Sequence, residues 1–444
     1  MNFDARYLHD RLLEFEAIAD KPRRYLVAFS GGIDSTVLLH ALATGKSMPG
    51  TPLLAVHVDH GLHPDSGDWD ARCRRVAGDL GVEYTSRKIE VSHKSPGGPE
   101  AAEREARYAI LGSLMLEHDW LISAHHEHDQ AETLLLNLLR GSGLTGISGI
   151  SPIREFARGH LVRPMLGVPA SAIRAYADQH RLGWIDDPSN ADTAFDRNYL
   201  RREVMPLLAA RWPAAATRLR QSADLAAEAS DLLAELADLD LKSSPSPDRL
   251  DIGTFVGHSA ARQRNALRRA VHRLGLPAPP ATRLYQAVHE LIPARPDAQP
   301  LVTWPGGEFR RYRDHLHILA PMPELGPCPG DLLRPDRTIE LGVGQGTLVL
   351  KSSDDGGIEC SVAEEGLQIR YRVGGEEIGL RGQAHRHKLK KLLQEAGIVP
   401  WMRDRIPLLY AGDRLVAVAD LWLAAEFSGG DGYAVHWRNR PALY

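Results

Sequence analysis

The first half of the chain alternates between short strand-like runs and longer stretches with apolar residues at helical spacing. Strands are predicted at 25–29, 53–58, 82–89 and 120–124. Helices are predicted at 3–15, 35–43, 67–80, 100–118 and 130–140. Because strands that alternate with helices build a parallel sheet covered on both faces, we expect a doubly wound α/β fold here.

The second half of the chain has a different pattern. Helical spacing continues through 169–180 and 196–206, and an Ala- and Leu-rich helical stretch and a second helical unit follow. After a linker rich in Pro and Gly, short strands and one basic helix are predicted. We therefore expect three domains, which are an α/β domain at 1–213, a helical domain at 214–320 and a small mixed α+β domain at 321–444.

Composition narrows the class of protein. The 444 residues are 43% hydrophobic and 25% charged, which is typical of a soluble globular protein, and no apolar run or N-terminal pattern predicts a membrane span or a signal peptide. Three scattered cysteines argue for a reducing compartment such as the cytoplasm, and against a disulfide framework or a thiolate-bound metal. A net charge of −4 means that any nucleic-acid binding must rest on local basic patches.

Ser30-Gly31-Gly32-Ile33-Asp34-Ser35 lies between the first strand and the helix that follows it. Two glycines allow a tight turn and close approach of a ligand, and the helix N-terminus favours phosphate. The serines add hydroxyl donors, and Asp34 is suited to hold a magnesium ion. The loop has no Gly-Lys-Ser/Thr triplet, so it is not a Walker loop. The alternative is a turn that binds nothing. The hexapeptide resembles the pyrophosphate loop of N-type ATP pyrophosphatases, which adenylate a substrate oxygen.

Two further segments carry candidate chemistry. Around Arg104 and Arg107 one helix face gathers guanidinium groups that suit phosphate, although Glu–Arg pairs on a solvated helix are the alternative. Imidazoles and carboxylates crowd the stretch from His125 to Glu132, just past a predicted strand end. Asp129 could simply cap a helix there, and a transition-metal site is disfavoured because no cysteine assists the crowded histidines.

Taken together and in order, these segments resemble the tRNA(Ile)-lysidine synthase family. The resemblance rests on 30–35, 56–62, 100–108, 125–133, 140–143, 184–190, 197–201, 388–393, 397–403 and 406–409. It implies an ATP- and Mg²⁺-dependent ligase that forms a carbon–nitrogen bond. ATP adenylates the 2-carbonyl oxygen of the wobble cytidine in an isoleucine tRNA with a CAU anticodon, and free L-lysine then displaces AMP. The lysidine product changes codon reading from AUG to AUA and tRNA identity from Met to Ile.

The resemblance also implies site residues. Those for ATP are Ser30, Gly31, Gly32, Ile33, Asp34 and Ser35. Those for catalysis are Asp34, Arg104, Arg107, His126 and Asp129. Asp34 also holds the metal, and His126 and Asp129 are the candidates for the base that deprotonates lysine. Family members usually have two acidic residues before the Gln of the histidine motif, whereas this chain has His128-Asp129. Either Asp129 therefore serves alone or Asp34 holds the metal without its help.

Basic residues predict where tRNA is held. The predicted contacts are Arg201, Lys388, Lys390, Lys391 and Arg403. Broader patches are formed by Arg262, Arg264, Arg268, Arg269 and Arg273 and by Arg381, Arg386 and Arg405, with solvated helix faces as the alternative. Two competing functions stay open, a tRNA thiolase, which would need catalytic cysteines, and an inactive tRNA-binding protein. A homodimer is compatible with the sequence but not indicated by it.

Overall fold

The chain divides into two compact units, Met1–Leu233 and Ala234–Tyr444. The computed structural model describes residues 3–45, 51–59, 61, 66–89, 99–242, 244, 246–295, 298–354, 356–383 and 385–444. Within these ranges no helix is both long enough and apolar enough to cross a membrane.

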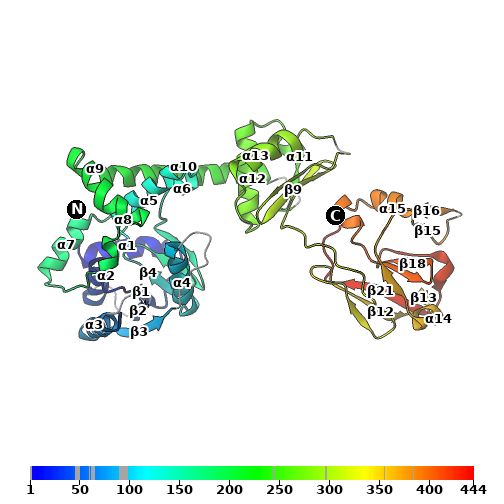
Figure 1. The fold of residues 1–444 in the computed structure, drawn as a ribbon, viewed down its shortest axis with the longest axis horizontal. Coiled ribbons are helices and arrows are strands. Elements are labelled where there is room, and N and C mark those ends of the chain that lie inside the picture. The colour runs from blue at the N-terminus through cyan, green and yellow to red at the C-terminus, as the bar shows by residue number, and fades with distance from the viewer. Residues whose placement is uncertain are drawn as a thin grey trace. The chain divides into compact units, whose positions relative to one another are not determined.

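The first unit is built on a six-stranded sheet with the strand order β3-β2-β1-β4-β6-β5 (Figure 1). The strands are β1 (Tyr25–Ala28), β2 (Leu53–Asp59), β3 (Glu83–Lys88), β4 (Trp120–Ile122), β5 (Ile153–Phe156) and β6 (Gly159–Val162). Five of them pair in parallel, and β5 pairs antiparallel with β6 at one edge.

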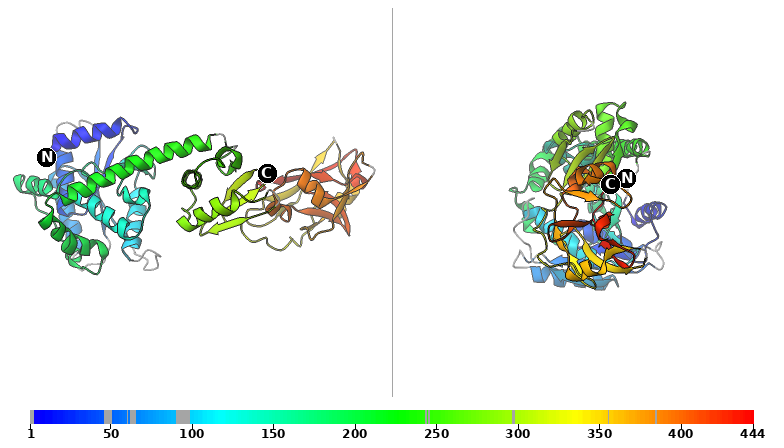
Figure 2. Two further views of the ribbon diagram at one scale, coloured as in Figure 1. Left: turned by 90° about the horizontal axis from the view of Figure 1, so that it is seen from above. Right: turned by 90° about the vertical axis from the view of Figure 1, so that its right-hand side faces the viewer.

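Helices connect these strands and continue beyond them. They are α1 (Ala5–Glu16), α2 (Ile33–Thr44), α3 (Ser66–Asp79), α4 (Pro99–Ser113), α5 (Glu127–Leu139), α6 (Leu144–Ile147), α7 (Ala170–Gln179), α8 (Asp196–Tyr199), α9 (Met205–Arg211) and α10 (Ala215–Leu241). A 3₁₀ turn, η1 (Pro188–Ala191), precedes α8, and a π-helical turn, η2 (Leu200–Val204), joins α8 to α9. Figure 2 shows α10 as one long, continuous helix.

Successive residues of the central strands serve two cores. Tyr25 and Val27 of β1 pack in a core formed with α1, α2, α3 and α7. Leu26, between them, packs in a second core that includes Leu111 of α4. This alternation follows from the period of two along a strand, and it buries the sheet on both faces. The predicted doubly wound parallel sheet is therefore confirmed.

One predicted helix is shorter than its periodicity indicates. Helical spacing runs from 100 to 118, but α4 ends at Ser113. The side chain of Asp119 accepts a hydrogen bond from the N–H of Leu116 at 2.8 Å, and Arg24 donates to the carbonyl of Leu114 at 3.2 Å. These contacts satisfy backbone groups outside the helix, which lets the chain turn into β4.

The region from 249 to 319 contains a sheet as well as the predicted helices. Its helical elements are α11 (Ile252–Phe255), α12 (Ala260–Arg273), α13 (Ala281–Gln286) and the π turn η3 (Ala287–Leu291). Besides the predicted helices, this region contains a four-stranded antiparallel sheet with the order β7-β10-β9-β8, which the sequence did not predict. The strands are β7 (Arg249–Asp251), β8 (Leu301–Trp304), β9 (Gly307–Tyr312) and β10 (His315–Leu319). Two tight turns, at Pro305-Gly306 and Arg313-Asp314, join β8, β9 and β10.

The remainder of the second unit consists of short strands and small helices, as predicted. Its sheets have the orders β11-β12-β21-β13-β20, β14-β17-β18-β19 and β15-β16. The strands are β11 (Thr338–Glu340), β12 (Thr347–Ser353), β13 (Gly357–Glu359), β14 (Gln368–Arg370), β15 (Glu377–Gly379), β16 (Arg386–Lys388), β17 (Leu408–Ala411), β18 (Arg414–Val418), β19 (Trp422–Leu423), β20 (Ser428–Gly429) and β21 (Gly432–Arg438). The helices are α14 (Cys360–Glu365), α15 (Leu389–Glu395), α16 (Pro400–Arg403) and the 3₁₀ turn η4 (Ala425–Phe427).

Neighbouring leucines on α1 provide a test of this packing. Leu12 is 1% exposed in the core beneath the sheet, whereas Leu13 is 48% exposed. We expect Leu12→Ala to lower the free energy of unfolding by about 2–5 kcal/mol, because it leaves a cavity. Leu13→Ala should change it by less than about 0.5 kcal/mol. Urea denaturation followed by circular dichroism measures both, and equal effects would contradict the assigned face of α1.

Candidate active site

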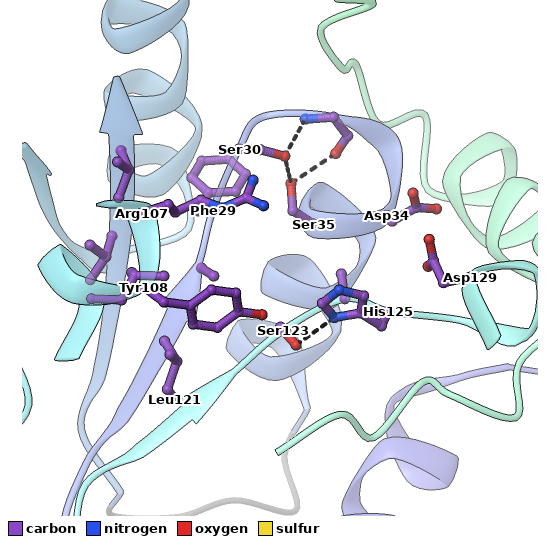
Figure 3. A pocket seen from close by; sticks show the side chains of 16 residues that line it. Phe29, Ser30, Asp34, Ser35, Arg107, Tyr108, Leu121, Ser123, His125 and Asp129 are labelled. Carbon is purple, nitrogen blue, oxygen red and sulfur yellow. Dashed lines mark hydrogen bonds between the residues drawn. The ribbon is translucent and has the colours of Figure 1, made fainter. Parts of the chain in front are cut away.

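The glycine-rich loop joins β1 to α2 at the carboxyl edge of the sheet, where ligands of such folds bind. Ser30 and Ser35 lie 3.1 Å apart through their hydroxyl oxygens, and Ser35 donates to the carbonyl of Gly32 at 3.0 Å (Figure 3). Gly32 is the N-cap of α2 and supplies no side chain to its first N–H groups. This end of α2 therefore presents unsatisfied donors and hydroxyl groups, which is the arrangement that binds phosphate.

Gly31 has a conformation and surroundings that only glycine fits. Its φ is +83°, and an added Cβ would lie 2.6 Å from Cδ1 of Ile185 and 2.7 Å from Sγ of Cys73. The carbonyl of Gly31 accepts hydrogen bonds from the N–H of Ile185 at 2.9 Å and from the hydroxyl of Thr36 at 3.2 Å. The segment around Ile185 thus supports the underside of the loop.

A cavity of about 210 Å³ opens beside the loop (Figure 3). Its apolar wall comes from the sheet and α4, and its polar groups come from the loop and the ends of the strands. The lining residues are Ala28, Phe29, Ser30, Gly32, Asp34, Ser35, Val56, Val58, Arg107, Tyr108, Leu111, Leu121, Ser123, Ala124, His125 and Asp129. An apolar slot next to a phosphate-binding loop suits a planar nucleobase joined to phosphates.

The two predicted arginines of α4 differ in position. Arg107 lines the cavity, and burial lowers the pKa of its guanidinium, which nevertheless stays charged because arginine titrates far above neutrality. Arg104 instead lies over the ring of Tyr108, with 5.1 Å between the guanidinium carbon and the ring centroid. Arg107 is therefore the better placed of the two to meet a ligand in the cavity.

The histidine motif begins α5 with a capping box. Nδ1 of His126 accepts the N–H of His128 at 3.2 Å, and Oδ2 of Asp129 accepts the N–H of His126 at 2.9 Å. This reciprocal pair starts the helix at Glu127, three residues before the predicted start at 130. His125 meets the hydroxyl of Ser123 at 2.9 Å, and burial lowers its pKa to about 3, so its ring is neutral.

Asp34 and Asp129 converge on one imidazole. Nε2 of His126 lies 3.7 Å from Oδ2 of Asp34 and 3.6 Å from Oδ2 of Asp129. Because Nδ1 of His126 accepts a backbone N–H, its neutral ring carries the proton on Nε2, facing both carboxylates. Burial raises the pKa of Asp34, the nearby Asp129 carboxylate adds to that shift, and His126 opposes it in its protonated form.

Asp129 also belongs to an ion-pair network of two carboxylates and two arginines. Asp129 accepts from Arg197 at 2.8 Å and from Arg201 at 3.3 Å. Glu132, 1% exposed, accepts from Arg197 at 2.9 Å and from Arg201 at 2.7 and 2.9 Å. Burial alone would raise the pKa of Asp129, but His126 and the two arginines hold it well below its usual range.

Sequence reasoning named neither Glu132 nor Arg197 as site residues, and it assigned Arg201 to tRNA. Their spacing held a signal, since Asp129 and Glu132 stand three residues apart and the two arginines four apart. Such pairs share one face of a helix, so each helix presents a matched pair to the other. The structure brings Arg201 to this network, and its guanidinium is still partly exposed.

The other basic residues predicted to meet tRNA lie in the second unit. Lys388, Lys390 and Lys391 are exposed, whereas Leu389, Leu392 and Leu393 between and beside them are buried. The guanidinium of Arg403 donates to the carbonyl of Ile398 at 2.9 Å and to the hydroxyl of Tyr312 at 3.0 Å.

The basic stripe on α12 is largely neutralised by acidic residues of α10. Arg262 donates to both carboxylate oxygens of Asp240. Arg269 and Arg273 each lie within 3 Å of a carboxylate oxygen of Asp238. The interpretation of this stripe as an ion-paired helix face is thus the better supported for these three arginines.

Ligands for a metal are few in the part of the chain that the structure describes, where no group of three or more His, Cys, Asp or Glu side chains is suited to hold an ion. The side chain of Asp34, 39% exposed, reaches the loop, whereas Asp129 is engaged by arginines. The three cysteines are free, with Cys73 buried and Cys328 and Cys360 exposed.

Comparisons with known proteins identify the family of this chain. Family models match as a PP-loop domain over residues 6–208, a TilS substrate binding domain over 250–317 and a TilS substrate C-terminal domain over 367–437. Among curated relatives, the tRNA(Ile)-lysidine synthase of Alkalilimnicola ehrlichii is 45% identical over 92% of this chain and 92% of its own length. That of Coxiella burnetii is 35% identical over 94% of this chain and 93% of its own length. The chain belongs to the tRNA(Ile)-lysidine synthase family.

Proposed function

We propose that this protein ligates L-lysine to C2 of the wobble cytidine of an isoleucine tRNA with a CAU anticodon, consuming ATP and releasing AMP and pyrophosphate. The observation that carries the proposal is the match to lysidine synthases over most of the chain, which includes both TilS domains as well as the PP-loop domain. Because these substrates are cytoplasmic, we expect the reaction there.

The first half of the reaction is assigned to the loop and the cavity. The loop N–H groups and the hydroxyls of Ser30 and Ser35 would hold the β- and γ-phosphates, and the apolar wall would hold the adenine. The 2-carbonyl oxygen of the cytidine attacks the α-phosphorus, and pyrophosphate leaves. Arg107, which lines the cavity, is placed to stabilise the charge that develops on the phosphate.

Asp34 is the residue that we assign to Mg²⁺. Its carboxylate is partly exposed at the loop, and hard oxygen ligands together with substrate phosphates suit this ion. A bound Mg²⁺ would neutralise phosphate charge. The single carboxylate fits a site that the phosphates of the substrate complete, rather than one closed by the protein.

The second half requires that the lysine ε-ammonium lose a proton before its nitrogen attacks C2 and AMP leaves. Nδ1 of His126 is engaged by the N-terminus of α5, so Nε2, which faces Asp34 and Asp129, is the ring nitrogen left for proton exchange. Asp129, whose pKa is lowered, stays ionised and suits attraction of the ammonium. Asp34, whose pKa burial raises, is the better acceptor, and departure of pyrophosphate frees it for this step.

Asp34→Asn should abolish pyrophosphate release while the fold is retained, because the amide keeps the shape but loses the charge. In the wild type, release should fall as the pH decreases toward the raised pKa of Asp34, since protonation removes the same charge. Pyrophosphate release measured against pH tests both points. Release at the wild-type rate by a folded Asp34→Asn variant would contradict the assignment.

Cysteine substitutions separate the ligase from a tRNA thiolase. We expect Cys328→Ser/Cys360→Ser to keep full activity, because neither residue belongs to the lining of the cavity and the three cysteines are free. Cys73→Ser changes a buried contact under the loop and serves as the comparison. Nucleoside mass analysis of the tRNA product is the measurement, and loss of product in the folded double variant would favour sulfur chemistry.

The lysines around α15 are proposed to hold tRNA away from the anticodon. Lys388→Ala/Lys390→Ala/Lys391→Ala should raise the Michaelis constant for full-length tRNA and flatten its salt dependence, because fewer counterions are released. The constant for a minimal anticodon stem-loop should stay the same. Lys351→Ala, at another exposed lysine of the second unit, is the control. An equal loss on both RNAs would contradict the proposed tRNA contact.

A further inference from the structure

Two aromatic side chains near the site are left exposed to solvent. Phe195 is the N-cap of α8 and is 38% exposed, and Tyr199, four residues later, is 51% exposed. Residues four apart lie on the same side of a helix. Single exposed apolar residues are common on protein surfaces, but a pair on one face of a short helix is less so.

The opposite side of this segment forms part of the site. Arg197 and Arg201, which alternate with the aromatic residues along the chain, donate to Asp129 and Glu132. Along the chain, Tyr199 therefore lies between the two arginines that bind Asp129 and Glu132. The π turn η2 begins directly after it, and such turns are frequent at functional sites.

Positive charge accompanies the aromatic pair. Arg202, three residues after Tyr199, is exposed, whereas the charge of Arg140, the C-cap of α5, is offset by Asp196 at 3.2 Å. Leu139, which precedes Arg140 in the sequence, is a further exposed apolar residue, at 77%. A surface that combines planar rings, apolar side chains and arginines matches unpaired nucleotides, whose bases stack on rings while their phosphates attract cations.

We propose that Phe195 and Tyr199 form a stacking platform for unpaired bases of the RNA loop whose cytidine enters the site. This inference rests on the proposed function, because it names how the same site holds its RNA. It assigns two faces with different tasks to residues 195–201, which comprise the N-cap of α8, α8 itself and the start of η2. One face positions the carboxylates through Arg197 and Arg201, and the other holds the loop next to them.

The test measures binding of a labelled anticodon stem-loop by fluorescence anisotropy, without ATP or lysine. Phe195→Ala and Tyr199→Ala should each raise the dissociation constant at least about fivefold, whereas Tyr199→Trp should bind as well as the wild type because stacking needs a ring and not a hydroxyl. Ile18→Ala is the matched control. Ile18 is 71% exposed, and it lies two residues before Asp20. The carbonyl of Asp20 accepts a hydrogen bond from the indole N–H of Trp120 at the start of β4, whereas the site lies at the other end of the strands.

Stem-loops with one abasic nucleotide show whether stacking is the cause. For one loop position, the loss from the missing base and the loss from Tyr199→Ala should not add, because each removes the same contact. Additive losses at every position, or wild-type binding by both alanine variants, would overturn the proposal. So would a change of oligomeric state in those variants with RNA binding intact, since the surface would then pair protein with protein. Lysidine formation by the wild type is assayed separately, so failure of the proposed function is distinguishable from failure of the platform.

Discussion

Two buried carboxylates with two arginines hold the candidate site together. Asp129 and Glu132 lie on α5, and Arg197 and Arg201 come from a segment more than sixty residues further along the chain. Carboxylates that are 9% and 1% exposed would be costly without these partners, because desolvation penalises an unpaired charge. The network therefore fixes α5 relative to α8. It also keeps Asp129 ionised, which is what a group that attracts an ammonium requires.

The same ion pairs give the two carboxyl groups beside His126 different pKa values. Asp34 and Asp129 both approach Nε2 of His126, yet their pKa values are shifted in opposite directions. Arg197 and Arg201 account for much of the difference, since both donate to Asp129. A pair of carboxyl groups with divergent pKa values allows one to hold charge while the other exchanges a proton.

Much of the first unit could be predicted from the sequence, because its signals are local. The glycine-rich loop and the motif at His126 each follow a strand, and parallel strands bring their carboxyl ends to one edge. The partners of Asp129 were not predicted, because the spacing of Arg197 and Arg201 indicates a shared helix face but not which distant carboxylates that face meets. The short strands at 301–319 were not predicted as separate elements, because the domain that contains them was defined by the helical pattern before them. For Arg262 the sequence left tRNA contact and a solvated helix face both open, because its partner Asp240 lies on another helix.

His126 combines two tasks that most proteins assign to separate residues. One ring nitrogen caps α5, and the other faces the pair of carboxylates. Substitutions at this position therefore confound the start of a helix with the chemistry of the site. The coupling also restricts how such a site can evolve. A residue that replaced His126 would have to keep an acceptor for the N–H of His128 and a polar group that faces both carboxylates.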